Sequence, residues 1–212
     1  MIPVRQVLAG ISIGLVLSGC SGTFTPPAAV VNGTRISEQV LGVRLEEALA
    51  SPDLASQLAG PNAAKVRADV ARQVLTGLIA DQIIERYARD HGIVVTGAEV
   101  TAELNTGIQQ LGGSAGLQRF LRQRHLTLPE LRTEIEEFLL RNKVLDAVTR
   151  ALPPDASSQQ RQAAFTSWVR GRMARADIEV NPRFGKFDPR RGAVCAVVST
   201  AGDVSPSCGQ PA

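Results

Sequence analysis

The longest amphipathic pattern in the chain runs from Asn62 to Val95. Within it, apolar residues recur at spacings of three to five positions, as they do along one face of an α-helix. These residues are Val66, Val70, Val74, Leu78, Ile83, Ile84 and Tyr87. Asn62 is a suitable N-cap, and His91 followed by Gly92 is a typical helix end, since glycine readily adopts the left-handed conformation. The pattern predicts a helix of about 28 residues and about 42 Å, along which other helices must pack.

The same spacing predicts five shorter helices, at residues 37–50, 96–111, 114–125, 127–152 and 158–174. Two of them begin with a capping box, in which a threonine hydroxyl accepts a backbone N–H and a glutamate three residues later reaches back. The boxes are Thr96 with Glu99 and Thr127 with Glu130. Pro129 is expected at the first helical position, where its missing N–H costs nothing. Residues 51–61 are expected to form a loop that holds a short turn at most.

Short β-favouring segments lie at opposite ends of this helical region. AAVVN at residues 28–32 precedes the strong turn signal Asn32–Gly33, and in DIEVN at residues 177–181 apolar and polar side chains alternate. Each segment needs a partner strand, so we expect the two to pair. The predicted fold class is therefore mainly α, a lobe of about six helices with a short two-stranded β pairing of the chain ends.

The C-terminal segment is expected to form a small hairpin around Val194. If Cys20 carries lipid, Cys195 and Cys208 remain as an even pair, and a disulfide is their simplest use. Such a bridge would stabilise the hairpin by about 3 kcal/mol in the chain-entropy model. A metal site is the alternative, but His91 and His125 are distant in sequence and no CxxC occurs. We expect no metal and no cofactor.

The N-terminus has the features of a lipoprotein leader. Met1–Arg5 is a short charged start, and the apolar run Val7–Val16 is shorter than the roughly 20 residues of a membrane-spanning helix. Leu17-Ser18-Gly19-Cys20 is similar to the lipobox of bacterial lipoproteins, which implies cleavage before Cys20 and acylation of that cysteine. We therefore expect a signal peptide at residues 1–19, a flexible tether at 20–29 and a lipid anchor on the extracytoplasmic side of the cell membrane. An ordinary secretory signal with a chance cysteine is the alternative.

Composition and charge narrow the function classes. Hydrophobic residues make up 44% of the chain, which excludes general disorder, and aromatic residues only 4%, so aliphatic side chains must fill the core. The net charge is +3 and the two signs are interleaved along most of the chain, which argues against nucleic-acid binding. Residues 161–191 carry eight Lys or Arg and three acids. This basic run could face anionic lipid headgroups or simply be a solvated surface.

Four segments together carry a family resemblance. They are AVVNGTRIS, LIADQIIERYARDHGIVVTGAEV, FLRQRHLTLPELRTEIEEFLLRNKVL and ADIEVNPRFGKFDP. In this combination they resemble the N-terminal domain of SurA-type and PrsA-type extracytoplasmic chaperones. The resemblance implies a helical lobe at residues 30–182 that cradles unfolded secreted polypeptides, completed by a returning final helix. Residues 183–212 would then be a basic tail with the disulfide loop.

The chain departs from this family in one respect. Family members commonly carry parvulin-type prolyl isomerase domains of about a hundred residues before the final helix, whereas only Pro153–Ser157 separates the predicted helices here. We therefore expect no isomerase activity. No GxSxG, HExxH, P-loop or Rossmann fingerprint occurs, and His91 and His125 are each expected at a helix end rather than in acid–base chemistry. The chain is not expected to be an enzyme.

The expected function is binding of unfolded or partner polypeptides by a membrane-anchored, chaperone-like lipoprotein, without catalysis. Candidate binding residues are apolar side chains on the arm formed by residues 92–140. They are Leu111, Leu117, Phe120, Leu121, Leu126 and Leu128. Two alternatives stay open. The six residues could instead hold the arm helices together, and the lobe could be an adaptor that docks one fixed envelope partner.

Overall fold

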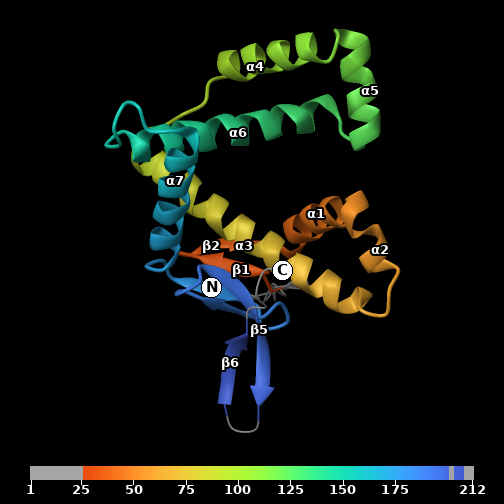
Figure 1. Cartoon of the computed structure of the whole chain (residues 1–212), viewed down its shortest axis with the longest axis vertical. Coiled ribbons are helices and arrows are strands. Elements are labelled where there is room, and N and C mark those ends of the chain that lie inside the picture. The colour runs from red at the N-terminus through yellow and green to blue at the C-terminus, as the bar shows by residue number, and fades with distance from the viewer. Residues whose placement is uncertain (1–25, 201–202, 208–212) are drawn as a thin grey trace, which may run out of the picture.

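The computed structural model describes residues 26–200 and 203–207. Its helices are α1 (Glu38–Leu49), α2 (Ala55–Leu58), α3 (Ala63–Asp90), α4 (Gly97–Gln110), α5 (Ser114–Arg124), α6 (Leu128–Thr149) and α7 (Ser158–Met173). Its strands are β1 (Ala29–Val31), β2 (Thr34–Ile36), β3 (Ile178–Val180), β4 (Lys186–Asp188), β5 (Ala193–Thr200) and β6 (Asp203–Ser207). The described part is mainly helical with two small three-stranded sheets, which confirms the predicted class (Figure 1).

The six predicted helices are α1 and α3 to α7. Both predicted capping boxes are confirmed, and α7 begins with a third that we did not predict, between Ser157 and Gln160. Pro129 occupies the second helical position of α6 rather than the first, where a backbone donor is equally unneeded. The predicted loop at 51–61 contains a 3₁₀ turn at Pro52–Leu54 and the short α2.

Helix α3 is the central element, as its length predicted. Leu75 and Ile79 are fully buried, so the face that packs most closely lies one position away from the predicted stripe of Val70, Val74 and Leu78. The predicted C-terminal end of α3 is confirmed. Gly92 has φ of +63°, and the N–H of the next residue, Ile93, donates to a carbonyl in the last turn. Asn62 is the N-cap residue, as predicted, but its side chain makes no capping hydrogen bond.

The chain ends pair as predicted. β1 runs antiparallel to β3 with Val31 opposite Ile178. The sheet also contains β2, which we did not predict and which pairs with β1 across the Asn32–Gly33 turn. Both turn residues have positive φ, as a tight hairpin requires. The Asn32 side chain in addition accepts the N–H of Asp177 at 3.0 Å, so the turn itself ties the two chain ends together.

The second sheet has the order β4-β5-β6. The predicted C-terminal hairpin corresponds to β5 and β6, and β4 adds an unpredicted edge strand. Phe187 and Val194 from this sheet belong to the same hydrophobic core as the helices, and the Val194 N–H donates to Thr76 of α3 at 2.9 Å. Cys195 is 1% exposed. Cys208 lies outside the described residues, as do the predicted signal peptide and Cys20, so the disulfide and the lipidation stay predictions.

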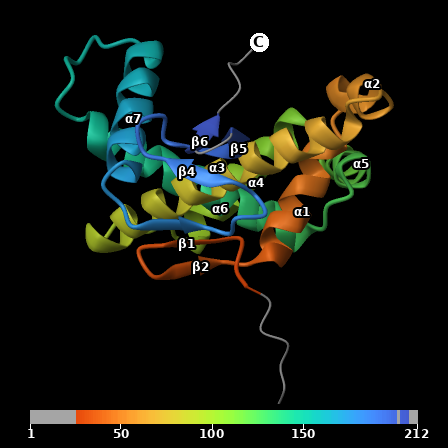
Figure 2. The ribbon, with the colours of Figure 1, turned by 90° about the horizontal axis from the view of Figure 1, so that it is seen from below.

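The helices divide into a body and an arm. In the body, α1, α6 and α7 pack around α3, and the two sheets lie along one side of it (Figures 1 and 2). The arm consists of α4, α5 and the first half of α6, and it lies at the top of Figure 1, away from the sheets. The buried apolar residues of α4 and α5 lie outside the main core; they are Val100, Leu104, Leu117 and Leu121. The arm therefore has its own small contact layer.

Candidate functional site

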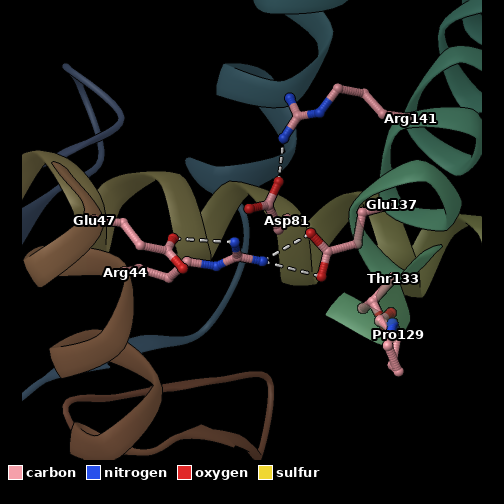
Figure 3. Close-up of polar contacts among 7 residues, drawn as sticks. All are labelled: Arg44, Glu47, Asp81, Pro129, Thr133, Glu137 and Arg141. Carbon is pink, nitrogen blue, oxygen red and sulfur yellow. Dashed lines mark hydrogen bonds and ion pairs between the residues drawn. The ribbon is translucent and has the colours of Figure 1, made fainter. Parts of the chain in front are cut away.

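A groove runs between α1 and α6, with α3 as its floor (Figure 3). It consists of two adjoining cavities of about 460 Å³ and 400 Å³. The two cavities share Val40, Arg44, Glu134 and Glu137. Leu78, Asp81 and Ile84 of α3 lie along the floor of the larger one. The groove is thus formed where the arm passes over the body.

The groove has exposed apolar side chains on both walls. Val40 and Val43 of α1 are 47% and 54% exposed, and Phe138 of α6 is 52% exposed. Leu41, between the two valines in sequence, is 2% exposed and packs into the core, so α1 is apolar on two sides. Clustered apolar side chains on a protein surface are typical of interaction sites. The groove is therefore a candidate interaction site.

Arg44 connects the two walls. Its guanidinium donates to Glu137 on α6 at 2.9 Å and to Glu47 on its own helix at 3.4 Å (Figure 3). Burial alone would lower the pKa of Arg44, but the carboxylates of Glu137, Glu47 and Glu134 outweigh that effect and raise it above its ordinary value. Arg44 therefore stays fully charged and bridges the mouth of the groove through side chains that are only partly buried.

A second ion pair lies beside the Arg44 bridge in the groove. Asp81 on α3 accepts from Arg141 on α6, and Figure 3 shows it next to the Arg44 bridge. Burial raises the pKa of Asp81 above its ordinary value, and the nearby cations Arg141 and Arg44 oppose that shift. This pair joins α6 to α3 on the same stretch of α6 that carries Phe138.

The base of the arm is held by a third polar contact. Lys143 on α6 pairs with Glu99 in the first turn of α4 at 2.6 Å and donates to the backbone carbonyl of Val94 at 2.8 Å. The pKa of Glu99 is lowered to about 2 by the hydrogen bond from Lys143 and by those from Thr96. These contacts set where α4 leaves the body and therefore how the arm stands over the groove.

The six apolar residues predicted to bind clients differ in exposure and position. Leu126 lines the smaller cavity of the groove. Leu111 and Leu128 are 37% and 41% exposed at the ends of arm helices, and Leu117 and Leu121 are 9% exposed inside the arm. Phe120 is half-buried, with the Arg124 guanidinium 6.0 Å from its ring centre. Of the six, Leu126 is the one that the structure places in the groove.

The groove residues Val40, Val43 and Phe138 were not among the predicted candidates. Apolar residues at helical spacing usually pack against a neighbouring element, so the spacing alone did not mark these three as exposed. A sequence signal for α1 does exist. Val40 and Leu41 are adjacent, and Val43 follows, so the apolar residues are spread over a wider arc than one buried face requires. The groove could not be located this way, since its other wall comes from a distant part of the chain.

The groove offers contact surface and charge. Within residues 26–200 and 203–207, no three His, Cys, Asp or Glu side chains gather as metal ligands would. Every helix in that part of the chain is too short or too polar to cross a bilayer. The arrangement is suited to holding an extended ligand between two walls, with apolar contacts on both and ion pairs that can exchange partners.

Comparison with known proteins identifies the family. The family described as SurA-like N-terminal domain matches residues 2–145, which include both walls and the floor of the groove. No curated protein matched the chain. The match covers well over half of the 212 residues, and the matched part contains the β1–β2 hairpin, helices α1 to α5 and most of α6. The chain belongs to the SurA-like N-terminal domain family.

Proposed function

We propose that the protein binds unfolded or partner polypeptide segments in the groove between α1 and α6. Family membership suggests a chaperone-like or adaptor role. The observation that supports polypeptide binding in this groove is the exposure of Val40, Val43 and Phe138 on facing walls. An apolar client side chain placed between them would remove apolar surface from water on both sides, at about 25 cal/mol per Å².

The Arg44 bridge is compatible with this role. Its partners Glu47 and Glu137 are about half exposed, and ion pairs of this kind contribute only about 0–1 kcal/mol to stability. An incoming polypeptide can therefore displace the bridge at small cost. The groove would keep its floor, because the core beneath α3 contains none of the bridge residues.

We also propose that the protein is a lipoprotein anchored through Cys20 on the extracytoplasmic side of the membrane and that it acts without catalysis. Both proposals are supported by the sequence: the lipobox-like tetrapeptide for the anchor, and the absence of an isomerase-sized insertion before α7 for the second. Metabolic labelling with a fatty acid would test the anchor, with Cys20→Ser expected to lose the label. A proline-peptide exchange assay is expected to show no acceleration.

The chaperone-like role is tested by aggregation of several unrelated denatured proteins in the presence of the purified chain. The wild type should delay aggregation of most of them. The double variant Val43→Ser and Phe138→Ser should need about fivefold more protein for the same delay, as expected for about 1 kcal/mol of lost binding. Val94→Ser is the matched control, because Val94 is 66% exposed and lines neither groove cavity. Equal effects of both variants would contradict binding in the groove.

The adaptor role is the alternative within the same family assignment. An adaptor would leave the aggregation of all these substrates unchanged and would co-purify from cells with one protein. Crosslinking in intact cells, followed by identification of the bound chains, separates the two. Many partners indicate a chaperone, and a single partner that is lost with Phe138→Ser indicates an adaptor.

A further inference from the structure

Acidic side chains outnumber basic ones around the groove. Its two cavities are lined by six carboxylates and three guanidinium groups. The carboxylates belong to Glu47, Asp81, Glu85, Glu130, Glu134 and Glu137, and the guanidinium groups to Arg35, Arg44 and Arg141. The chain as a whole carries a net charge of +3. The groove is therefore a local reversal of the overall charge, placed where the apolar walls are exposed.

The acidic excess is concentrated on the α6 wall. Glu130, Glu134 and Glu137 follow one another at spacings of four and three residues, which puts them on one face of the helix. Arg44 is shared between Glu137 and Glu47, and the Glu130 carboxylate is used by Thr127 at the N-cap. Glu134 makes no hydrogen bond or ion pair within the described part of the chain, although its charge helps to raise the pKa of Arg44. The Glu134 carboxylate on the α6 wall is therefore available to pair with a cation from a ligand.

Helix stability does not account for this row. Acids are favoured by the helix dipole in the first turn, which explains Glu130 but not Glu134 or Glu137 further along. Two glutamates four residues apart repel each other and cost about 0.2–0.5 kcal/mol. The row is thus a slightly unfavourable feature of α6 on its own, and a cation brought between its members would relieve the repulsion.

The apolar side chains lie next to the acidic row. Phe138 follows Glu137 directly on α6, and Val40 and Val43 lie on the opposite wall. A segment in this groove would meet apolar side chains on both walls and carboxylates mainly on the α6 wall. Lys and Arg suit such a site in two ways, because their charged ends pair with carboxylates while their methylene stems cover apolar surface. An arginine can also stack on the exposed Phe138 ring.

We propose, building on the polypeptide-binding role above, that the groove selects segments in which apolar residues are flanked by Lys or Arg. The apolar side chains contact Val40, Val43 and Phe138, and the cations pair with Glu134 and its neighbours on α6. Segments with acidic flanks are disfavoured, since their carboxylates would meet the same row. The charge complementarity of the α6 wall supports this class of partner.

The test uses three fluorescent peptides with the same apolar core and Lys, Ser or Glu flanks. Binding to the purified full chain is measured by fluorescence anisotropy at low and high salt. We expect the Lys-flanked peptide to bind about fivefold more tightly than the Glu-flanked one at about 0.05 M salt, as a few partly exposed ion pairs would give. The difference should fall below about twofold at about 0.5 M salt, where the Debye length is a few ångströms.

Variants locate the selectivity in the groove. Glu134→Gln should reduce the preference for Lys flanks by about half, and Glu134→Lys should abolish it. Glu46→Gln is the matched control, because it removes the same charge from α1 at an exposed position that lines neither cavity. It should leave the preference unchanged. Circular dichroism of each variant checks that the helices remain formed.

The outcomes separate this inference from the proposed function. Equal binding of all three peptides, lost with Phe138→Ser, would overturn the charge selectivity while leaving polypeptide binding in the groove. Binding of none of them would overturn both. Tighter binding of the Glu-flanked peptide would also overturn the selectivity. So would sedimentation as a dimer that the peptides do not dissociate, since a second copy would then occupy the groove.

Discussion

His125 ends α5 in a left-handed conformation, with φ of +52° and ψ of +34°. A non-glycine residue is strained there, typically by about 1 kcal/mol, because its Cβ approaches the backbone. The next residue, Leu126, donates its N–H back to the last turn of α5, so the geometry is the usual glycine-type helix end. A histidine occupies a position that favours glycine.

We therefore expect His125→Gly to increase the free energy of unfolding by about 0.5–1 kcal/mol. Urea denaturation followed by circular dichroism would measure the change. His91→Gly is the control. That histidine ends α3 with φ of −111° and stacks on Tyr87 with ring centres 3.8 Å apart, so glycine there should give no gain. A loss of stability in His125→Gly would show that the histidine side chain makes a contact that matters more than the strain.

Glu99 makes the stability of the arm depend on pH. Its pKa is lowered from 4.5 to about 2 in the folded protein, chiefly by the hydrogen bond from Lys143. A lowered folded-state pKa gives stability that is present above the ordinary pKa and is lost as the pH falls towards the folded-state value. The window of this loss therefore lies between about pH 4.5 and about pH 2.

Glu99→Gln tests the charge alone, because glutamine can keep the capping box with Thr96 but cannot ionise. The wild type should be more stable than the variant at neutral pH, and the difference should shrink steadily as the pH falls below about 4.5. Urea titrations from about pH 7 to about pH 3 would measure it. A difference that stays constant over this range would mean that Glu99 acts through its shape rather than its charge.

At the level of elements, the sequence predicted helix positions well and helix surroundings less well. The capping boxes at Thr96 and Thr127 and the stop at Gly92 depend on neighbouring residues, so they could be read directly and are confirmed. Which apolar residue is buried depends on what packs against the helix. Leu41 is buried and Val43 exposed for that reason alone. The groove on the exposed side of α1 could not be predicted from α1 itself.

The joint between α4 and α5 is expected to be sensitive to a single methyl group. A Cβ added at Gly116 would lie 1.8 Å from the Leu111 carbonyl oxygen, so the two helices could not approach as they do. Gly107, in α4, has no neighbouring atom within 4 Å of the same position. The two glycines are a matched pair in the arm, since alanine improves helix propensity at both and causes a clash at one.

We expect Gly107→Ala to stabilise the arm by about 0.5–1 kcal/mol and Gly116→Ala to destabilise it by about 1–3 kcal/mol. Amide hydrogen exchange would measure the effect locally, because α4 and α5 lie outside the main core and can open without it. Faster exchange in Gly116→Ala should be confined to the arm. Uniform loss of protection across α3 as well would show that the arm and body unfold as one unit.

At the level of the whole molecule, contacts between distant segments determine features that the sequence alone does not predict. The pairing of residues 28–32 with residues 177–181 was predicted, because both segments were β-favouring and lacked other partners. The sequence also predicted a boundary after residue 182, between the helical lobe and a tail. The chain continues into β4 and β5, whose Phe187 and Val194 pack into the core of the helical lobe. Short strands with few apolar residues give no sequence signal of what they will cover.

A substitution at Phe187 therefore tests whether residues 183–212 are a tail or part of the lobe. Its side chain is 9% exposed, so Phe187→Ala should lower the free energy of unfolding of the whole molecule by about 3–5 kcal/mol. Urea unfolding followed by the fluorescence of Trp168, which lies on α7 and packs against the same core, measures this at a distance from the substitution. Lys186→Ala, an exposed neighbour on the same strand, should change it by less than about 0.5 kcal/mol. A side chain that belongs to one cooperative core cannot be removed without shifting the unfolding of that whole core. If Phe187→Ala leaves the Trp168 transition unchanged from the wild type, the second sheet therefore unfolds separately. The boundary predicted after residue 182 would then divide two independently unfolding units.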